Sequence, residues 1–553
     1  MSNLMKKTGA NRLLNVHDLC IEGYQEEEWR QIVNGVSFYV DRGEVLGLIG
    51  ESGAGKSTIG IASMGYTRAG CRIKAGSILF DGKELFGADY ETLRRVRGPR
   101  IAYVAQSAAA SFNPAHKLIH QFVEMPVQEG IMSFSKAEAR AKELFRRLDL
   151  PDPDNIGDRY PHQVSGGQLQ RCMVAMAMAC NPDLIVFDEP TTALDVTTQI
   201  EVLGAIKEVI QAYGTAAIYI THDLAVVAQI ADRIMVLQHG YEVETGETRQ
   251  MIESPKKDYT RELLSVRKTR GKTINHGGEE TVLAVENVRA AYGNNVIVLD
   301  GINTKIGRGK TVSIVGESGS GKSTLARVIT GLLAPIDGKV HFCGEVIPPK
   351  LKNRPKELLR RMQMIYQMPD TALNPKHKVK KILGRPLNFY FGMSGKERDQ
   401  RILKLLELIE LGPEYMERYP DELSGGEKQR VCIARALAAK PDLIICDEVT
   451  SALDQLVAKG ILKLLQNLQN ELQVSYIFIT HDLDTVKAIS DHIVVMYQGK
   501  VVEQGPKSDI LNPPYEPYTD LLLSSAPEMN PDWLDHVIKH RQRLADKGVS
   551  IRS

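Results

Sequence analysis

The chain has 553 residues, which at about 150 residues per domain predicts two to four domains rather than one hydrophobic core. Hydrophobic residues make up 43% and charged residues 25% of it, as in folded globular proteins, so a disordered or fibrous chain is excluded. Lys and Arg number 69 and Asp and Glu 68, and a net charge of +1 gives no overall attraction to nucleic acid or to an anionic membrane.

We expect a cytoplasmic protein, because no segment has the character of a membrane span or a signal peptide. The apolar run of residues 173–180 stops at Asn181-Pro-Asp, well short of the ~20 apolar residues that a spanning helix needs. Lys6 and Lys7 are followed by polar residues where a signal peptide needs an apolar stretch. The seven cysteines are scattered and form no C-x-x-C pair, so we predict reduced, buried thiols and neither a zinc site nor an iron–sulfur cluster.

The first predicted functional element is a strand over residues 45–49 that runs into a glycine-rich loop and a helix. The loop, Gly50-Glu-Ser-Gly-Ala-Gly-Lys-Ser-Thr58, has the pattern G-x-x-x-x-G-K-[ST]. In this pattern backbone N–H groups surround phosphates, the lysine reaches the β- and γ-phosphates, and the serine binds Mg²⁺. We therefore predict that ATP and Mg²⁺ bind to Gly50, Ser52, Gly53, Gly55, Lys56, Ser57 and Thr58.

Polar residues follow further predicted strands along the chain. Asp188 comes after the apolar run 184–187 and suits a carboxylate that holds the hydration shell of Mg²⁺, while the next residue, Glu189, can polarise the attacking water. His222 follows the run 217–220 and can bond the γ-phosphate. Gln106 lies where a flexible amide can reach Mg²⁺ and the water. An acidic pair or a lone histidine is usually structural, but their order behind the phosphate loop favours function.

The same motifs occur a second time, in the same order. Lys56 recurs as Lys322 with an offset of 266, and the later motifs recur with an offset of 259, so seven residues are missing from the second copy between them. Apolar runs at 312–315, 443–446 and 476–479 match those of the first copy. The second set of residues is Gly316, Ser318, Gly319, Gly321, Lys322, Ser323, Thr324, Gln367, Asp447, Glu448 and His481. Chance is an unlikely source of two such sets.

The repeat predicts the domain organisation. We expect a first nucleotide-binding domain over residues 1–265, a polar linker over 266–282, a second nucleotide-binding domain over 283–525 and a tail over 526–553. The tail reads as a helix from about Asn530, with Trp533, Val537 and Leu544 on one face. Most such tails pack on their own domain, and a regulatory or permease contact is the alternative.

A second anion site is predicted in each copy. Val164-Ser-Gly-Gly-Gln168 and Leu423-Ser-Gly-Gly-Glu427 each open a helical stretch, and a helix N-terminus preceded by serine and glycine attracts anions. A domain with one phosphate loop needs no second phosphate site for the same nucleotide. We therefore expect each segment to serve the ATP of the opposite half, with ligands Ser165, Gly166, Gly167, Gln168, Ser424, Gly425, Gly426 and Glu427.

These segments resemble the LSGGQ signature of the ABC ATPases, with Val164 and Glu427 as conservative departures, and the resemblance covers residues from about 14 to 525. Residues 106–114 and 367–375 are similar to the Q-loops of the oligopeptide, dipeptide and nickel importer ATPases, and residues 255–260 and 514–519 to the segment that follows their domains. Fused pairs of this kind resemble the ATPases of glutathione and microcin C uptake.

The resemblance implies an α/β fold of two tandem P-loop domains, each with a core parallel sheet, a β-subdomain and a helical subdomain. It adds Asp195, Asp454 and the adenine-stacking Tyr292 to the nucleotide sites; Tyr24 is one place out of register and is either its counterpart or an ordinary loop residue. Mg²⁺ is assigned to Ser57, Gln106, Asp188, Ser323, Gln367 and Asp447, and catalysis to Glu189, Glu448, His222 and His481.

The resemblance also implies the partners. The chain would be the ATP-hydrolysing subunit of an importer for peptides or a related small solute, peripheral on the cytoplasmic face of the cell membrane. Two permease subunits would dock beside the Q-loops, an extracytoplasmic binding protein would act indirectly, and nucleic acid is not expected. The alternative is a soluble twin-cassette ATPase that acts on a cytosolic enzyme or nucleoprotein.

Overall fold

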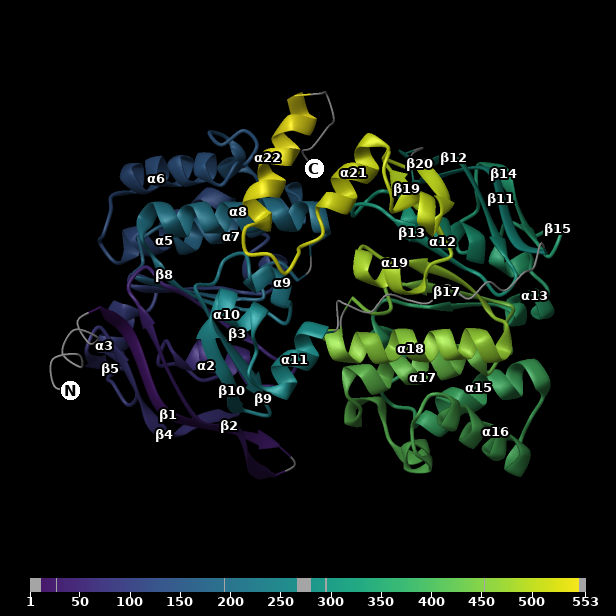
Figure 1. Ribbon diagram of the computed structural model, residues 1–553, viewed down its shortest axis with the longest axis horizontal. Helices are drawn as coiled ribbons and strands as arrows, with labels where there is room; N and C mark the ends of the chain where they lie inside the picture. Colours follow the sequence, from purple (N-terminus) through teal and green to yellow (C-terminus); the bar gives the residue numbers. More distant parts are fainter. Residues whose placement is uncertain are drawn as a thin grey trace. The chain divides into compact units, whose positions relative to one another are not determined.

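The computed structural model describes residues 11–25, 27–192, 194–265, 280–293, 296–451 and 453–546, of which 544–546 are described in their backbone alone. The chain divides into two compact units, each an α/β structure (Figure 1). The first unit contains the described residues up to Ser265 together with Pro527–Asp546. The second unit contains the described residues between Ser265 and Pro527. Residues 266–279, which make up most of the predicted linker, lie outside the described residues. The side chain of Leu544, predicted to share a face of the tail helix with Trp533 and Val537, lies outside them too.

The first unit is built around a six-stranded sheet in the order β10-β9-β3-β8-β7-β6. All neighbouring strands are parallel except β10, which pairs antiparallel with β9. The strands are β3 (Val45–Ile49), β6 (Ile101–Val104), β7 (Leu184–Asp188), β8 (Ala216–Ile220), β9 (Arg233–Gln238) and β10 (Tyr241–Glu247). The predicted strands at 45–49, 184–187 and 217–220 are therefore confirmed.

An antiparallel sheet and a set of helices complete this unit. The sheet has the order β2-β1-β4-β5, with β1 (Arg12–Gln25), β2 (Glu28–Asp41), β4 (Cys71–Phe80) and β5 (Lys83–Glu84). The helices are α2 (Lys56–Ala62), α3 (Tyr90–Val96), α4 (Ala108–Ser111), α5 (Leu118–Gln128), α6 (Phe134–Arg147), α7 (Gly166–Ala177), α8 (Val196–Tyr213), α9 (Leu224–Val227), α10 (Thr248–Glu253), α11 (Asp258–Ser265) and α22 (Trp533–Asp546).

The second unit repeats this plan. Its mainly parallel sheet has the order β16-β17-β18-β13-β19-β20, and its antiparallel sheet the order β12-β11-β14-β15. The strands are β11 (Thr281–Tyr292), β12 (Val296–Gly307), β13 (Thr311–Val315), β14 (Asp337–Phe342), β15 (Glu345–Val346), β16 (Met362–Ile365), β17 (Leu443–Asp447), β18 (Ser475–Ile479), β19 (His492–Tyr497) and β20 (Lys500–Pro506). The predicted α/β fold, with its parallel core in each half, is confirmed.

The helices of the second unit match α2 to α11 of the first one by one, and α22 has no counterpart among them. They are α12 (Lys322–Thr330), α13 (Lys356–Arg361), α14 (Pro369–Ala372), α15 (Val379–Phe391), α16 (Gly395–Leu408), α17 (Gly425–Leu437), α18 (Gln455–Leu472), α19 (Leu483–Ile489), α20 (Lys507–Ile510) and α21 (Pro517–Ser524). Helices α15 to α18 form a helical layer with its own apolar core, and the antiparallel sheet packs with α12 around another.

The parallel strands separate these two cores. Along β17, Leu443 and Ile445 join the core under the antiparallel sheet, whereas Ile444 and Cys446 join the core under the helices. Successive side chains of a strand point to opposite faces, so a strand covered on both sides must be apolar throughout. Each fully buried aliphatic side chain contributes about 1.5–3 kcal/mol. The strand therefore holds the polar residues that follow it in a fixed position.

Three expectations differ from the structure. Strand β11 begins at Thr281, inside the stretch 266–282 predicted as linker, because the alternating apolar residues of the strand start there. Cys172, Cys432 and Cys446 are buried free thiols, as predicted, but Cys20, Cys71, Cys180 and Cys343 are only half-buried. Cys20 alternates on β1 with the core residues Leu19 and Ile21, Cys71 begins β4, and Cys180 and Cys343 lie in turns. The tail helix α22 packs on the first unit and not on the domain that precedes it in the sequence.

Candidate nucleotide sites

The carboxyl ends of three neighbouring parallel strands bring the predicted site residues together in each unit. In the first unit β3, β8 and β7 are adjacent, and they end directly before the phosphate loop, before Thr221-His222 and at Asp188. In the second unit β13, β18 and β17 do the same for Gly316, His481 and Asp447. Ligands bind at this edge in open α/β sheets.

The two phosphate loops have the same conformation. Gly50 and Gly316 have φ of 151° and 146°, and a Cβ on either would lie 2.2 or 2.1 Å from the backbone oxygen of Leu237 or Met496. Only glycine tolerates so close an approach. The ammonium groups of the buried Lys56 and Lys322 donate to the carbonyls of the first two loop residues, at 2.6–2.8 Å. The lysines are thus held at the loops, where phosphates would bind.

The predicted Mg²⁺ ligands meet in pairs. Ser57 Oγ donates to Asp188 Oδ1 at 2.6 Å, and Ser323 Oγ donates to Asp447 Oδ1 at 3.1 Å. A hydroxyl and a carboxylate side by side at the end of a strand are the oxygen ligands that Mg²⁺ prefers. The residues present therefore fit this ion.

The glutamate after each aspartate is the centre of a small hydrogen-bond network. Gln106 Nε2 donates to Glu189 Oε2 at 3.1 Å, and His222 Nδ1 lies 3.2 Å from Glu189 Oε1. In the second unit Gln367 Nε2 lies 2.7 Å from Glu448 and His481 Nδ1 lies 3.3 Å from it. The structure thus brings together three residues per unit, a glutamine, a glutamate and a histidine, that the sequence had assigned to hydrolysis.

The electrostatics of the network suit a base. Burial alone lowers the pKa of His222, but its hydrogen bond to Glu189 and the charge of that carboxylate raise it above the ordinary value. Burial alone raises the pKa of Glu189, and the bond to His222 lowers it below the ordinary value. His481 shows the same raised pKa through Glu448. Glu189 is therefore ionised near neutral pH and can accept a proton.

Both glutamates adopt a left-handed backbone conformation. Glu189 has φ of 49° and Glu448 has φ of 51°, an arrangement that is uncommon for residues other than glycine. Each is held by a backbone hydrogen bond, from its own N–H to the carbonyl of Ile220 or Ile479 at the end of the neighbouring strand. Strain of this kind is retained where the surrounding structure fixes it, commonly at functional sites.

The signature segments begin helices α7 and α17, and the last residue of each segment caps its own helix. Ser165 Oγ accepts from the N–H of Gln168, whose side chain in turn accepts from the N–H of Ser165. Ser424 and Glu427 form the same reciprocal cap. Gln168 and Glu427 thus fold back onto their own helices, which is the usual function of Gln or Glu at that position. Ligand roles for them stay a prediction.

Asp195 and Asp454 are also helix caps. The side chain of Asp195 accepts from the N–H of Thr198 at the start of α8, and Asp454 accepts from the N–H of Val457 at the start of α18. Each precedes its helix by one residue, as N-cap residues do. The caps fix these helix N-termini, and a contact of either aspartate with nucleotide stays a prediction.

The predicted adenine-stacking position differs between the units. Tyr292 ends β11 and is 38% exposed, and its hydroxyl accepts from Arg327 at 3.0 Å. Pairing with the adjacent strands aligns Leu14 with Leu283, an offset of 269, and places Gly23 at the position of Tyr292. Tyr24 is one residue further, where a strand presents its opposite face, and its ring lies 5.3 Å from that of Trp29. Tyr24 is therefore not the counterpart of Tyr292.

Sequence reasoning missed Tyr103. This residue of β6 donates to Asp188 Oδ2 at 2.6 Å, and Arg68 approaches the same carboxylate at 3.6 Å. In the second unit β16 carries Met364 instead, and burial raises the pKa of Asp447. A polar aromatic residue in an otherwise buried strand beside Gln106 was the available signal. The two sites thus differ in how firmly they hold the aspartate.

This arrangement defines a P-loop ATPase with two cassettes, and comparison with known proteins agrees. A family model described as ABC transporter matches residues 33–192 and 299–451, and one described as oligopeptide/dipeptide transporter, C-terminal region, matches residues 502–549. Among the described residues, no helix combines the length and apolar character that crossing a bilayer requires.

Curated relatives match over almost the whole chain. The peptidoglycan transport ATP-binding protein YejF of Agrobacterium fabrum is 37% identical over 94% of this chain and 98% of its own length. The glutathione import ATP-binding protein GsiA of Salmonella choleraesuis is 36% identical over 96% of this chain and 91% of its own length. The chain belongs to the ABC transporter family, in its oligopeptide/dipeptide branch. It is an ATPase that couples hydrolysis to import, and the soluble alternative is not supported.

Proposed function

We propose that this chain drives separate permease subunits from the cytoplasmic face of the cell membrane and that its cargo is a peptide or a related small solute. The observation that carries the catalytic part is the pair of networks around Glu189 and Glu448, each bonded to a glutamine and a histidine. The cargo class is supported by the C-terminal match to oligopeptide/dipeptide transporters and by relatives named for glutathione import and peptidoglycan transport.

Each residue then has a defined part in hydrolysis. Glu189 or Glu448 accepts a proton from the attacking water, and the lowered pKa of Glu189 keeps that carboxylate ionised. Both glutamates follow strands that end at the same sheet edge as the phosphate loop of their cassette. The glutamine and the histidine hold that carboxylate from two sides, and Lys56 or Lys322 binds the phosphates. Mg²⁺, bound through Ser57 with Asp188 and through Ser323 with Asp447, would neutralise phosphate charge. Loss of one glutamate would leave the other site intact.

We further propose that both ATP sites are composite. Each cassette has one phosphate loop and, separate from it in the sequence, a signature helix whose N-terminus begins at Ser165 or Ser424 and suits a second anion. Because the phosphate loop already binds the ATP of its own cassette, the N-terminus of the signature helix would bind the phosphates of the ATP held by the other cassette. Lys56 would then be opposed to Ser424 and Gly426, and Lys322 to Ser165 and Gly167.

Vanadate-dependent photocleavage tests the composite sites. Vanadate trapped with ADP at Lys56 should cut the chain at Ser424, and vanadate trapped at Lys322 should cut it at Ser165, because the reactive oxyanion touches the signature of the opposite cassette. Fragments are identified by mass spectrometry, and the Lys56→Ala and Lys322→Ala variants each remove one cut as controls. Cleavage at the signature of the same cassette would contradict the arrangement.

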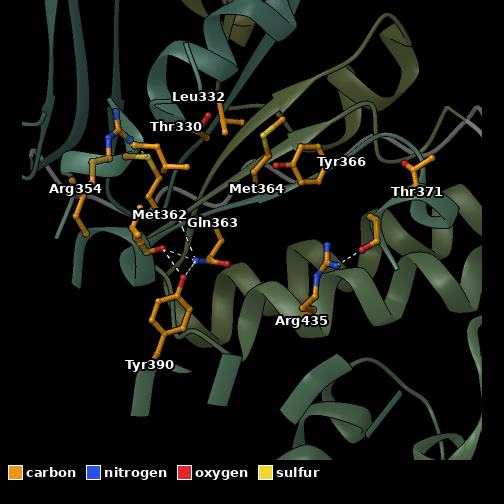
Figure 2. Close-up of a pocket in the computed structure, with 14 residues that line it drawn as sticks. Thr330, Leu332, Arg354, Met362, Gln363, Met364, Tyr366, Thr371, Tyr390 and Arg435 are labelled. Carbon is orange, nitrogen blue, oxygen red and sulfur yellow. Dashed lines mark hydrogen bonds between the residues drawn. The ribbon is translucent and has the colours of Figure 1, made fainter. Parts of the chain in front are cut away.

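A pocket in the second cassette supports permease docking. It has a volume of about 720 Å³ and lies beside β16, with α12 and α13 on one side and α15 and α17 on the other. Figure 2 shows Leu332, Met364 and Tyr366 along it, with Thr371 and Arg435 at one end. Apolar side chains, two of them the flexible Met362 and Met364, suit an amphipathic helix laid into a groove. The lining is Thr330, Leu332, Leu351, Arg354, Leu358, Leu359, Met362, Gln363, Met364, Tyr366, Thr371, Ala372, Tyr390 and Arg435.

The pocket is connected to the catalytic network. Its wall includes Tyr366, Thr371 and Ala372, which flank Gln367 in the sequence, and Gln367 is bonded to Glu448. A permease helix in the pocket would therefore press on the segment that carries the catalytic amide. In this way cargo binding outside the membrane could change the rate of hydrolysis through the permease.

Coupling is tested with the Leu332→Glu variant. Leu332 is 50% exposed at the pocket, so the new charge should leave the fold and the ATPase rate of the isolated chain within about twofold, but it should oppose an apolar helix. After tagging, the wild-type chain should recover permeases from membranes, and loaded binding protein should stimulate its ATPase in proteoliposomes. Both responses should be lost in the variant.

Val346→Glu is the matched control, because Val346 is 56% exposed on β15 and does not line the pocket. It should behave as wild type in both assays. If ribosomes or DNA stimulated the isolated chain and no permease were recovered, the proposal of an importer subunit would have to be abandoned.

A further inference from the structure

The C-terminal tail returns to the first cassette after the second cassette is complete. Helix α22, shown in yellow against α8 in Figure 1, buries Trp533, Leu534, Val537 and Arg541 in the first unit. The chain therefore reaches that unit twice, once from its N-terminal end and once from its C-terminal end. Arginine is rarely buried unless it is paired, so the burial of Arg541 indicates a specific contact between the tail and this unit.

Buried polar groups fix the position of the tail. The side chain of Gln229, which follows α9 and is 3% exposed, donates to the carbonyls of Glu528 and Asn530 and accepts from the N–H of Leu534, at 2.8–3.0 Å. Burying an amide is favourable only when its hydrogen bonds are made. This contact therefore specifies one register of the tail on the cassette.

Arg541 completes a buried triad that joins three helices. Its guanidinium donates to the carbonyl of Thr197 at 2.9 Å and to Glu201 at 3.3 Å. Arg171 of α7 lies 3.4 Å from the other oxygen of Glu201 and donates to the carbonyls of Leu148 and Asp149. One carboxylate on α8 thus links the signature helix α7 to the tail helix α22.

The triad lies close to the N-termini of both helices. Thr197 and Thr198 form the first turn of α8, directly after Asp195, and Gly167 is in the first turn of α7. A Cβ on Gly167 would lie 2.1 Å from Thr198 Cγ2, so these two turns are in close contact. Arg541 therefore binds the backbone carbonyl of Thr197, and the next residue, Thr198, is the one that contacts Gly167 of the signature helix.

At the described positions that correspond to the tail-binding residues of the first cassette, the second cassette has different residues. With the offset of 259, Glu201 corresponds to Gly460, Gln229 to Ala488 and Gly204 to Lys463. A Cβ on Gly204 would already lie 3.2 Å from Ile538, so a lysine at that position would displace the tail. Arg430, the counterpart of Arg171, is instead bonded to Glu410 and to the carbonyl of Ile409. These differences explain why the tail packs on the first cassette and not on the second.

We propose that helix α22 is a positioning element for the signature segment of the first cassette and so controls turnover at the ATP site whose phosphate loop lies in the second cassette. The inference rests on the composite sites proposed above. Through Arg541, the tail holds the first turns of α7 and α8 in the relative position that the opposite nucleotide needs. A helix near the C-terminus thereby affects the ATP bound at Lys322, because it positions the signature segment that contacts this ATP.

Arg541→Gln, placed in two backgrounds, tests this. In Glu189→Gln the remaining turnover occurs at Lys322 with Ser165, and Arg541→Gln should lower its kcat by about tenfold, the loss of one charged hydrogen-bond pair. In Glu448→Gln the remaining site uses Lys56 with Ser424, and the rate should stay within about twofold. Arg541→Lys, which keeps one bond, should restore part of the loss.

Controls separate positioning from damage to the fold. Arg543→Gln changes an exposed arginine of the same helix and should have no effect in either background. A chain ending at Ala526, and the variant Gln229→Leu, should reproduce the pattern of Arg541→Gln. An equal loss in both backgrounds, a loss confined to Glu448→Gln, or no loss would each overturn the inference. Photocleavage of the same variants reports separately whether the composite arrangement itself holds.

Discussion

The double variant Glu189→Gln with Glu448→Gln is expected to bind ATP and to hydrolyse it about 10²–10⁴ times more slowly than the wild type. Glutamine has the shape of glutamate and can still bond Gln106 and His222, or Gln367 and His481, but its amide cannot accept a proton from water. ATP should therefore accumulate in the protein unhydrolysed. Turnover of radiolabelled ATP and the nucleotide retained after gel filtration measure the two effects.

Single variants and a control complete this experiment. Each single variant should keep activity at its intact site, since both networks contain the same three residue types, glutamine, glutamate and histidine. Glu242→Gln removes an exposed carboxylate of β10 and should leave hydrolysis unchanged. Full activity in the double variant would show that another group takes the proton and that the assignment of the base is wrong.

Much of the fold could be predicted because buried parallel strands must be apolar on both faces. Such a run in the sequence, ending at a glycine, an acid or a histidine, marks both the strand and the sheet edge where those residues meet. The structure confirms the runs before Gly50, at Asp188 and before His222. The repeat then predicts the second cassette as well, since the same motifs reappear in the same order with offsets of 266 and 259.

What could not be predicted depends on contacts between distant segments. The tail docks by Arg541 and Gln229, whose partners Glu201 and Leu534 lie far away in the sequence and have no periodic pattern. The place of Tyr103 beside Gln106 was a signal in the sequence, but its contact with Asp188 follows only from the pairing of β6 with β7. Such pairings are set by tertiary packing, which local propensity does not encode.

The position of Tyr292 illustrates the limit of counting residues. Its counterpart is Gly23, which only the strand pairing reveals, because a shift of one residue moves a side chain to the other face of a sheet. A Cβ on Gly23 would lie 2.5 Å from Ile32, so this position in the first cassette holds no side chain. The position predicted to stack on adenine is thus built differently in the two cassettes, although the phosphate loops are alike.

Gly50→Ala is expected to destabilise the first cassette by about 3 kcal/mol and to abolish ATP binding at Lys56. The added Cβ would lie 2.2 Å from the carbonyl oxygen of Leu237 at the end of β9, and the backbone has φ of 151°. Either the loop or the neighbouring strand must move, and both carry the site. Urea unfolding without nucleotide measures the stability, and a fluorescent ATP analogue measures binding in a Lys322→Ala background.

Gly53→Ala is the matched control within the same loop. Gly53 also has a left-handed backbone, with φ of 82°, but a Cβ there would meet no atom within 4 Å. Its cost should therefore be only the conformational strain of about 1–2 kcal/mol. The difference between the two variants isolates the contact with Leu237. Equal stability of the two variants would contradict the prediction. The positive φ that Gly50 and Gly53 share would then explain the need for glycine at position 50, without a contribution from packing against β9.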